Sequence, residues 1–206
     1  MPKFYSFIEQ LKIRVKKPLP GFEAQKIMMP EGRDTIVPKN YKKAAVLLLL
    51  YPFNNHPYFI LIKRVNDNTP HSGQISLPGG QQEVMDTSLW QTAKRETAEE
   101  IGITINDEDM IGHLSPLYIP VSNFCVYPFI AYKKKMPNFL PNYDEVENII
   151  QANYQNFFKP ENIVKRKFLS NKKIIFAPAY YYKNYYIWGA TAMILSEFYY
   201  ISKNFN

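Results

Sequence analysis

The segment 77–103 constrains the fold of this chain most strongly, because a glycine turn is followed by a helix with a carboxylate-rich face. The paired glycines at 79–80 favour a tight turn, since glycine adopts backbone angles that other residues avoid. Glu96, Glu99 and Glu100 follow at spacings i, i+3 and i+4, which makes them neighbours on a helix surface. Like charges at these spacings destabilise a helix, so a cation is expected beside them. A hard divalent ion such as Mg²⁺ prefers oxygen ligands of this kind.

Local signals define both ends of this helix. Ser88, followed three residues later by Gln91, predicts an N-terminal capping box, and Gly102 predicts the C-terminal stop. The expected helix therefore covers residues 89–101. The alternative interpretation of its acidic face is a cluster of solvated surface charges.

The same segment resembles the Nudix box, G-x5-E-x7-R-E-U-x-E-E-x-G-U, in which U is a bulky apolar residue. The match is close from Arg95 to Ile103, although Thr97 takes the first apolar position. Asp86 occupies the acidic position before the arginine, and eight residues rather than seven separate it from Arg95. The resemblance implies metal-dependent hydrolysis of a pyrophosphate linkage in a nucleoside-diphosphate-linked substrate, with Mg²⁺ or Mn²⁺ as the cofactor.

The loop before the box is similar to the signature of the coenzyme A pyrophosphatase branch, L-L-T-x-R-[SA]-x3-R-x3-G-x3-F-P-G-G. Arg64, Gly73 and the Pro-Gly-Gly at 78–80 fall at the expected spacing. The positions that differ from the signature are Ile62, Val65, Thr69 and Leu77. The segment 187–192, Ile-Trp-Gly-Ala-Thr-Ala, also resembles that branch. The branch implies coenzyme A or acyl-coenzyme A as the substrate.

Thr69 stands where the branch has a second arginine, and threonine cannot replace the charge that binds phosphate. Alternative substrates therefore remain open, namely ADP-ribose, NADH and dinucleoside polyphosphates. A non-catalytic Nudix module that senses a nucleotide is a further alternative.

The resemblance also implies roles for individual residues. The expected metal ligands are Glu96, Glu99, Glu100 and the Gly79 carbonyl. The expected catalytic residues are Arg95, which would orient a box glutamate, Glu96, Glu99 and a general base at Glu145. The expected substrate-binding residues are Arg64, His71, Gly73 and Gln74. Glu147 is an alternative base, and a solvated loop is the competing interpretation for both candidates.

Apolar periodicity and turn residues place the other elements. Apolar residues recur at helical spacing from Phe4 to Val15, and prolines and glycines then predict an irregular arm up to residue 38. The expected strands cover 44–51, 58–65, 111–119, 125–133, 146–151, 172–179 and 185–188, with a longer hairpin loop at 52–57. A short helix is expected at 154–158 and a last helix from Ala190. These elements predict an α/β fold, a Nudix-type α/β/α sandwich around a mixed β-sheet, with one domain at 39–206 on which the arm 1–38 packs.

Composition narrows the environment and the partners. The chain has 206 residues, 46% of them apolar, and carries a net charge of +7, but its lysines are scattered and predict no nucleic-acid partner. The single cysteine, Cys125, excludes an internal disulfide and fits a reducing compartment. The longest apolar run, 44–51, is far shorter than a membrane span, and the N-terminus lacks a signal-peptide pattern. These features predict a cytoplasmic protein that binds a small nucleotide and no membrane, and they leave a homodimer open.

Overall fold

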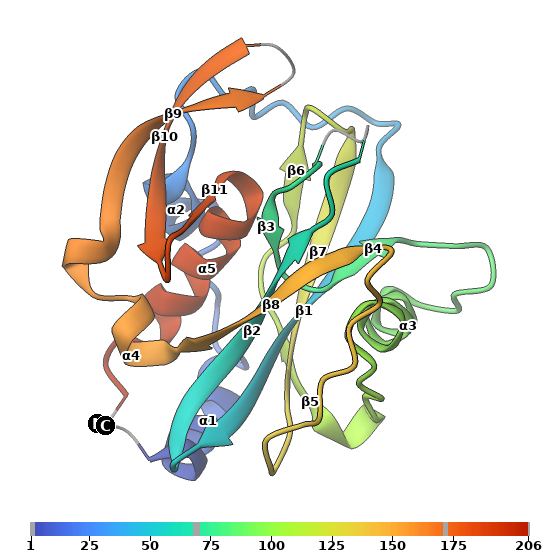
Figure 1. Cartoon of the computed structure of the whole chain (residues 1–206), viewed down its shortest axis with the longest axis vertical. Coiled ribbons are helices and arrows are strands. Elements are labelled where there is room, and N and C mark those ends of the chain that lie inside the picture. Colours follow the sequence, from blue (N-terminus) through green and yellow to red (C-terminus); the bar gives the residue numbers. More distant parts are fainter. Residues whose placement is uncertain (1–2, 68–70, 171–172, 206) are drawn as a thin grey trace.

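A mixed β-sheet centred on β1 organises the chain (Figure 1). The computed structural model describes residues 3–67, 71–170 and 173–205. The strands of the main sheet are β1 (Lys42–Phe53), β2 (His56–Arg64), β3 (Ile75–Ser76), β4 (Gly79–Gln81), β5 (Met110–His113), β6 (Leu117–Ile119), β7 (Phe124–Tyr132) and β8 (Val146–Asn153). Within it, β1 pairs parallel with β7 and antiparallel with β2 and β4, whereas β8 and β3 pair with β2. The mixed sheet is therefore as expected.

Helices cover both faces of this sheet. The helices are α1 (Phe4–Arg14), α2 (Phe22–Gln25), α3 (Leu89–Ile101), α4 (Tyr154–Phe157) and α5 (Gly189–Ser202), with shorter turns η1 (Lys26–Met28), η2 (Asp107–Asp109) and η3 (Pro160–Asn162). Figure 1 shows α3 on one side of the sheet and α1 and α5 on the other. None of the helices in the described ranges has the length and apolar character that a membrane crossing requires.

The alternation of leucines along β1 explains why both faces are covered. Leu47 and Leu49 belong to the buried cluster that includes residues of α3, whereas Leu48 and Leu50 belong to the cluster that includes α1 and α5. Successive side chains of a strand point to opposite faces, so an apolar run of this kind needs a helix layer on each side. This arrangement confirms the predicted α/β/α sandwich.

Several element boundaries differ from those expected. The loop between β1 and β2 is two residues rather than six, because Asn54 and Asn55 both adopt positive φ (48° and 63°) and close a tight turn. The single strand expected at 111–119 is divided into β5 and β6. The helix α3 covers the expected residues; Ser88 Oγ accepts a hydrogen bond from Gln91 N (3.1 Å), and Gly102 ends the helix with φ 70°.

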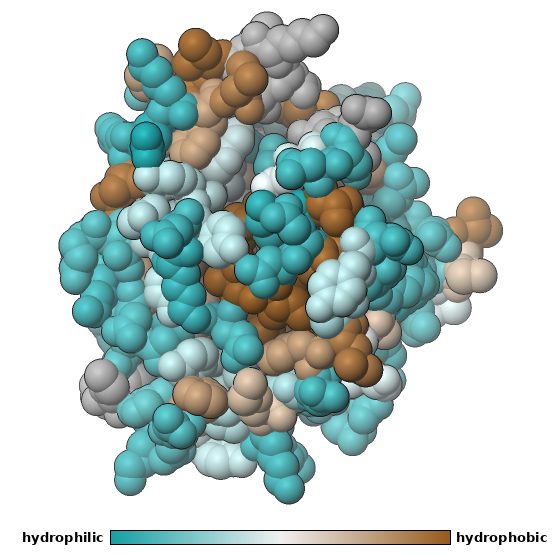
Figure 2. Space-filling model, viewed as in Figure 1, coloured by the Kyte–Doolittle hydropathy of each residue, from teal (hydrophilic) through white to brown (hydrophobic). Residues whose placement is uncertain are grey.

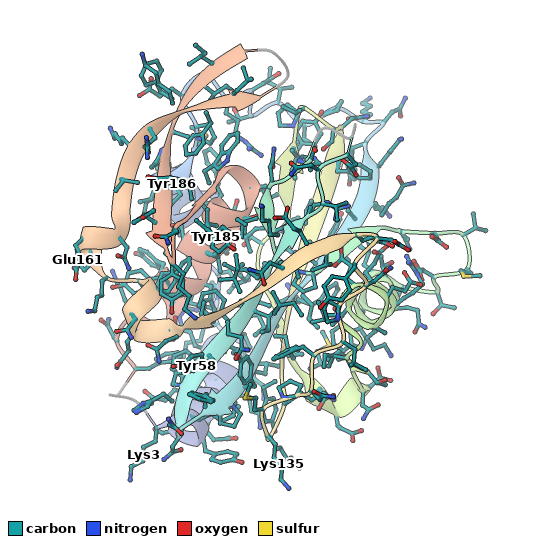
Figure 3. The ribbon with its side chains drawn as sticks, viewed as in Figure 1. Lys3, Tyr58, Lys135, Glu161, Tyr185 and Tyr186 are labelled. Carbon is teal, nitrogen blue, oxygen red and sulfur yellow. The ribbon has the colours of Figure 1, made fainter. Side chains whose placement is uncertain are left out.

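A second, three-stranded antiparallel sheet was not expected. It consists of β9 (Ile163–Ser170), β10 (Lys173–Tyr182) and β11 (Tyr185–Trp188). Tyr185, labelled in Figure 3, joins it to the main sheet, since its hydroxyl accepts a hydrogen bond from Asn148 Nδ2 of β8 (2.8 Å). The strands at 172–179 and 185–188 were thus predicted, but neither their separate sheet nor their partner β9 was.

The N-terminal arm is docked on α5. Glu197 of α5 is completely buried and accepts hydrogen bonds from Gly21 N (3.1 Å) and Gln25 Nε2 (2.9 Å) of the arm. The same carboxylate accepts hydrogen bonds from Ser115 N and Ser115 Oγ in the loop between β5 and β6. The arm contains α2 and η1, so it is more regular than expected, and the domain boundary at residue 38 remains a prediction.

Candidate active site

The box helix places Glu100 against the glycine turn. This side chain is 1% exposed, and its carboxylate accepts hydrogen bonds from Gly79 N (2.8 Å) and Arg64 Nη1 (3.2 Å). Glu96 lies equally close to the turn: a Cβ added to Gly80 would meet Glu96 Oε1 at 2.5 Å. Glycine therefore lets β4 and the acidic face of α3 approach each other.

Burial acts against ionisation of both carboxylates. Burial raises the pKa of Glu100 to about 8, against the opposing effects of the Gly79 N–H and Arg64. Burial likewise raises the pKa of Glu96 above its ordinary value, although Arg95 acts in the opposite direction. Desolvation disfavours the charged form of a carboxylate, and a neighbouring negative charge adds to the effect. By its chemistry a divalent cation fits this donor set, because it prefers oxygen ligands and would add positive charge beside the carboxylates.

Arg95 connects the acidic residues of the box. Its guanidinium forms ion pairs with Glu96 (3.0 Å), Glu99 (2.8 Å) and Asp86 (3.0 Å) and donates a further hydrogen bond to Gln81 O (3.1 Å). The hydrogen bonds from Arg95 lower the pKa of Asp86 to about 2. Asp86 also accepts hydrogen bonds from Thr92 Oγ1 and Glu83 N. Asp86 therefore anchors the arginine in this conformation.

The expected metal ligands lie on one helix face, but their side chains are engaged by other groups. Among the described residues, no three His, Cys, Asp or Glu side chains converge closely enough to hold a metal ion. Arg95 holds Glu96 and Glu99, while Arg64 holds Glu100. Gly79 contributes its N–H to Glu100, and the role of its carbonyl as a ligand remains a prediction.

Of the two candidate bases, Glu145 is the one whose charge acts on the helix carboxylates. Its negative charge contributes to the raised pKa of both Glu96 and Glu100. Its backbone carbonyl accepts a hydrogen bond from Val65 N (3.0 Å), which places it beside the end of β2. Glu147 instead forms an ion pair with Lys63 (2.5 Å).

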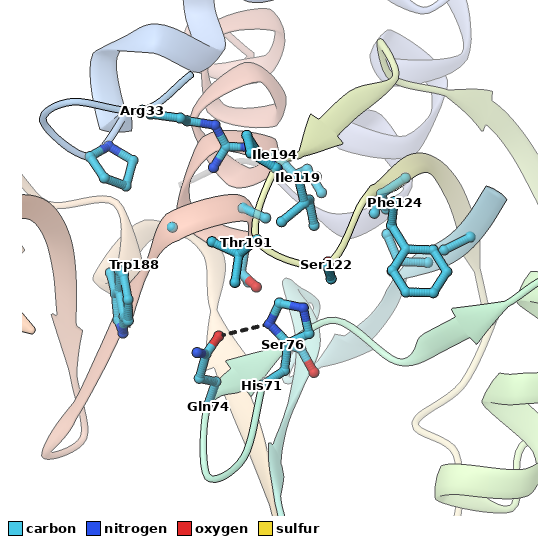
Figure 4. Close-up of a pocket in the computed structure, with 18 of the residues that line it drawn as sticks. Arg33, His71, Gln74, Ser76, Ile119, Ser122, Phe124, Trp188, Thr191 and Ile194 are labelled. Carbon is cyan, nitrogen blue, oxygen red and sulfur yellow. Dashed lines mark hydrogen bonds between the residues drawn. The ribbon is translucent and has the colours of Figure 1, made fainter. Parts of the chain in front are cut away.

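A cavity of about 1100 Å³ opens beside the glycine turn (Figure 4). Arg64, His71 and Gln74 line it, as expected of substrate-binding residues. His71 Nδ1 lies 3.3 Å from Gln74 Oε1, and burial lowers the pKa of the imidazole, which favours its neutral form. Gly79 and Gly80 line the same cavity, so it adjoins the acidic face of α3.

Gly73, the other residue expected to bind substrate, lies in a turn outside the cavity lining. It does not line the cavity but closes the turn before β3, with φ 66° and its N–H donating to Val65 O (3.1 Å). An added Cβ would meet Asn66 Oδ1 at 2.5 Å. Thr69, the position of the missing signature arginine, lies outside the described residues.

Residues of the arm, β1, β7, β11 and α5 complete the cavity wall, and sequence reasoning missed most of them. They include Arg33, Phe124, Trp188, Thr191 and Ile194, which are labelled in Figure 4, and Lys42. The resemblance at 187–192 marked the segment that contains Trp188 and Thr191, but no sequence pattern marked Arg33. On the face of the molecule seen in Figure 1, the space-filling view in Figure 2 shows a mainly hydrophilic surface with apolar side chains gathered near its middle.

The architecture defines an α/β/α sandwich in which one helix presents the buried Glu100 and the partly buried Glu96 beside a glycine turn and a large cavity. This chain belongs to the Nudix family, because the model of the NUDIX domain matches residues 41–177.

Individual relatives agree with this assignment. The chain is 34% identical to "Nudix hydrolase 15, mitochondrial" of Arabidopsis thaliana over 182 residues, which cover 85% of this chain and 62% of the relative. It is 36% identical to "Nudix hydrolase 22, chloroplastic" of the same plant over 163 residues, which cover 75% of this chain and 53% of the relative. It is 28% identical to the uncharacterized Nudix hydrolase NudL of Pectobacterium atrosepticum, with 78% of this chain and 83% of the relative covered. The chain thus spans less than two thirds of the length of the two plant relatives, whose names place them in organelles; a cytoplasmic location for this chain remains a prediction.

A solved structure shares the fold. The MutT/nudix family protein from Enterococcus faecalis superposes with a TM-score of 0.56 at 14% identity, covering 92% of this chain and 71% of that one. At this identity the likeness concerns the fold alone.

Proposed function

We propose that this chain hydrolyses a pyrophosphate linkage in a nucleoside-diphosphate-linked substrate with the help of Mg²⁺ or Mn²⁺. The observation that carries this proposal is a pair of carboxylates with raised pKa values, the partly buried Glu96 and the buried Glu100. Both lie beside the glycine turn that lines a large cavity. Folding alone does not require such a pair, since withdrawing carboxylates from water is costly even where an arginine offsets part of the charge. Perturbed carboxylates beside a cavity are typical of a functional site.

The cation would be held by Glu96, Glu100 and Glu99, with the Gly79 carbonyl as a further ligand. When bound, it would polarise the phosphoryl oxygens and lower the pKa of a water ligand. Glu145 would accept the proton of the attacking water at its carboxylate. The water oxygen forms a bond to one phosphorus, the bridging P–O bond breaks, and two phosphate monoesters leave. Arg95 would hold the carboxylate of Glu99 in place through its ion pair.

Coenzyme A or acyl-coenzyme A is the substrate that the sequence resemblance favours, through Arg64, Gly73 and the Pro-Gly-Gly turn at 78–80. The cavity also supports a substrate much larger than a pyrophosphate group, because its volume is at the upper end of the range of small-molecule sites. ADP-ribose, NADH and dinucleoside polyphosphates remain the alternative substrates, and a nucleotide-sensing module remains the alternative function.

The test is a hydrolysis assay with coenzyme A, acyl-coenzyme A, ADP-ribose, NADH and diadenosine polyphosphates, each with Mg²⁺, Mn²⁺ or EDTA, and with products resolved by chromatography. Metal-dependent cleavage of the coenzyme A pyrophosphate is the expected result. Preferential cleavage of another compound would keep the chemistry and change the substrate. Binding of a nucleotide without cleavage in any metal would contradict the enzymatic proposal and favour the sensing module.

A further inference from the structure

Arg33 is a partly buried cation in the wall of the cavity that the proposed chemistry does not use. It comes from the N-terminal arm, and Figure 4 shows its side chain extending beside Ile119 and Ile194. Burial lowers the pKa of its guanidinium to about 10. Arginine is seldom withdrawn from water without a partner, because desolvating a charge is costly.

The described residues provide very little compensation for this charge. Arg33 Nη2 donates a hydrogen bond to Tyr118 O at 2.5 Å, and no carboxylate of the described chain lies within ion-pair distance of the guanidinium. Glu31 and Asp34 also line the cavity, yet neither pairs with Arg33, and Asp34 Oδ1 accepts a hydrogen bond from Ile36 N. A guanidinium has five N–H donors, so most of its capacity is available to a ligand.

The position of Arg33 is built into the fold. On one side, Glu31 N donates a hydrogen bond to Phe176 O of β10 (2.9 Å), and on the other the side chain is held by Tyr118 O of β6. The preceding part of the arm is fixed by the buried Glu197 of α5. A second cation, Lys42, lies in the same wall with its amino group 5.8 Å from the centre of the Phe124 ring.

Arg33 belongs to a different part of the wall from the residues that face the box helix. The residues next to Glu96 and Glu100 come from β2 and β4 and are Arg64, Gly79 and Gly80. Arg33 comes from the arm instead and lies beside β6 and α5. A planar guanidinium matches a phosphate group bidentately. Cations in two separate parts of one cavity suit a substrate with two separate groups of phosphates.

We propose that Arg33 binds a phosphate monoester of the substrate that is distinct from the scissile pyrophosphate, so that the arm selects nucleotides carrying this additional phosphate. The inference rests on the proposed hydrolysis at the box helix for its kinetic readout. It assigns to the arm a role in specificity that the sequence did not suggest.

The experiment compares coenzyme A with 3′-dephospho-coenzyme A, which differ only by a phosphate monoester. For the wild type, kcat/KM should be higher for coenzyme A. Arg33→Gln should reduce this preference about tenfold or more, mainly through a higher KM for coenzyme A, because a charge-assisted hydrogen bond is lost. Arg33→Lys should restore part of it. Equal losses for both substrates, or no loss for either, would overturn the proposal.

Arg14→Gln is the matched control. Arg14 also donates one hydrogen bond to a backbone carbonyl, that of Pro18 (3.1 Å), but it does not line the cavity. This variant should keep the wild-type preference. Thermal unfolding of all three variants separates a loss of recognition from a loss of folding.

A binding measurement separates failure of this inference from failure of the proposed function. Calorimetric titration with adenosine 3′,5′-bisphosphate and with AMP, in EDTA, requires no turnover. Tighter binding of the bisphosphate to the wild type, and loss of this difference in Arg33→Gln, would support the inference even if no substrate were hydrolysed. Equal affinities of the wild type for the two nucleotides would overturn it, whatever the hydrolysis assay shows.

Discussion

Glu100 shows how a single side chain acquires unusual chemistry from its position. A glutamate at this point of an exposed helix would be an ordinary solvated anion, but here the side chain is 1% exposed and accepts a hydrogen bond from Gly79 N of the glycine turn. The Nudix-box resemblance predicted that Glu96, Glu99 and Glu100 act together. It could not predict that Arg95 and Arg64 hold these carboxylates, because the contacts depend on where β2 and β4 lie.

Replacing Glu100 with glutamine should reduce metal-dependent hydrolysis by about 100-fold or more, because a neutral amide cannot offset the charge of a cation. The fold should persist, since the amide keeps the size of the side chain and an acceptor for Gly79 N. The measurement is kcat/KM, with thermal unfolding recorded in parallel. Glu108→Gln, at an exposed position in η2, is the control and should keep full activity. Wild-type activity in Glu100→Gln would remove this helix from the mechanism.

Asp86 should make stability depend on pH in the acid range. Its pKa is lowered from 3.8 to about 2 in the folded protein by the hydrogen bonds from Arg95. The unfolded chain therefore binds the proton first as the pH falls, so the stabilisation by Asp86 is complete only above about pH 5 and is lost progressively as the pH falls to about 2. Asp86→Asn should lower the free energy of unfolding at pH 7 and flatten its decline between pH 4 and 2. Urea unfolding at several pH values measures this dependence, and the exposed control Asp144→Asn should follow the wild type. If the free energy of unfolding of Asp86→Asn declined with pH as steeply as that of the wild type, Asp86 would not be the cause of the decline.

At the scale of elements, local signals were sufficient for α3 but not for the smaller sheet. The caps of α3 lie next to it in sequence, so Ser88 and Gly102 predicted its bounds. The strand β9 has charged residues among its apolar ones and is defined by its pairing with β10. The arm appeared irregular because its contacts with α5 involve residues more than 170 positions away.

The glycine turn is expected to tolerate no side chain at Gly79. This residue has φ 145°, and an added Cβ would lie 2.2 Å from Ala45 O, which would break the pairing of β4 with β1. Gly79→Ala should therefore destabilise the protein by several kcal/mol, on the order of a severe core change. Gly32→Ala is the matched control: φ is 68° there, but nothing lies within 4 Å, so only about 1 kcal/mol is expected. Chemical denaturation measures the free energy of unfolding of both variants. Equal losses would mean that the close approach of Gly79 to Ala45 O does not contribute to stability.

The anchor of the arm is expected to depend on Glu197. Removing its carboxylate in Glu197→Ala takes away one acceptor of the buried Gln25 amide and the acceptor of the partly buried Ser115 N–H, which should cost roughly 2 kcal/mol or more. The melting temperature should fall, and limited proteolysis should cut the arm sooner. Glu161→Ala, exposed in η3, should change neither (Figure 3). An unchanged arm in Glu197→Ala would show that apolar contacts alone hold it.

At the scale of the whole molecule, a positively charged protein surrounds an acidic site. The net charge of +7 favours a polyanionic substrate but does not locate its binding site. The cavity is formed by the arm, both sheets and α5, so its wall could not be predicted from any one segment. The site residues predicted from the sequence came from the box, from the loop before it, from Glu145 and from the segment 187–192.

Binding of a divalent cation should stabilise the whole fold. A ligand that binds only the folded state at ten times its Kd adds about 1.4 kcal/mol to the free energy of unfolding. Thermal unfolding of the wild type should therefore shift upward with Mg²⁺ or Mn²⁺ and return with EDTA. In Glu100→Gln the shift should be much smaller. An equal shift in both proteins would place the bound cation away from the box helix.

The span of the cavity wall, from Pro30 in the arm to Ile194 in α5, has a consequence for the order of events during synthesis. Arg33 leaves the ribosome long before the helix that fixes its arm, so a nascent chain contains the acidic helix well before it contains a closed binding site. Contacts between distant segments form late in folding. Recognition of a whole nucleotide should therefore be the last property that the chain acquires, after the box helix is already in place.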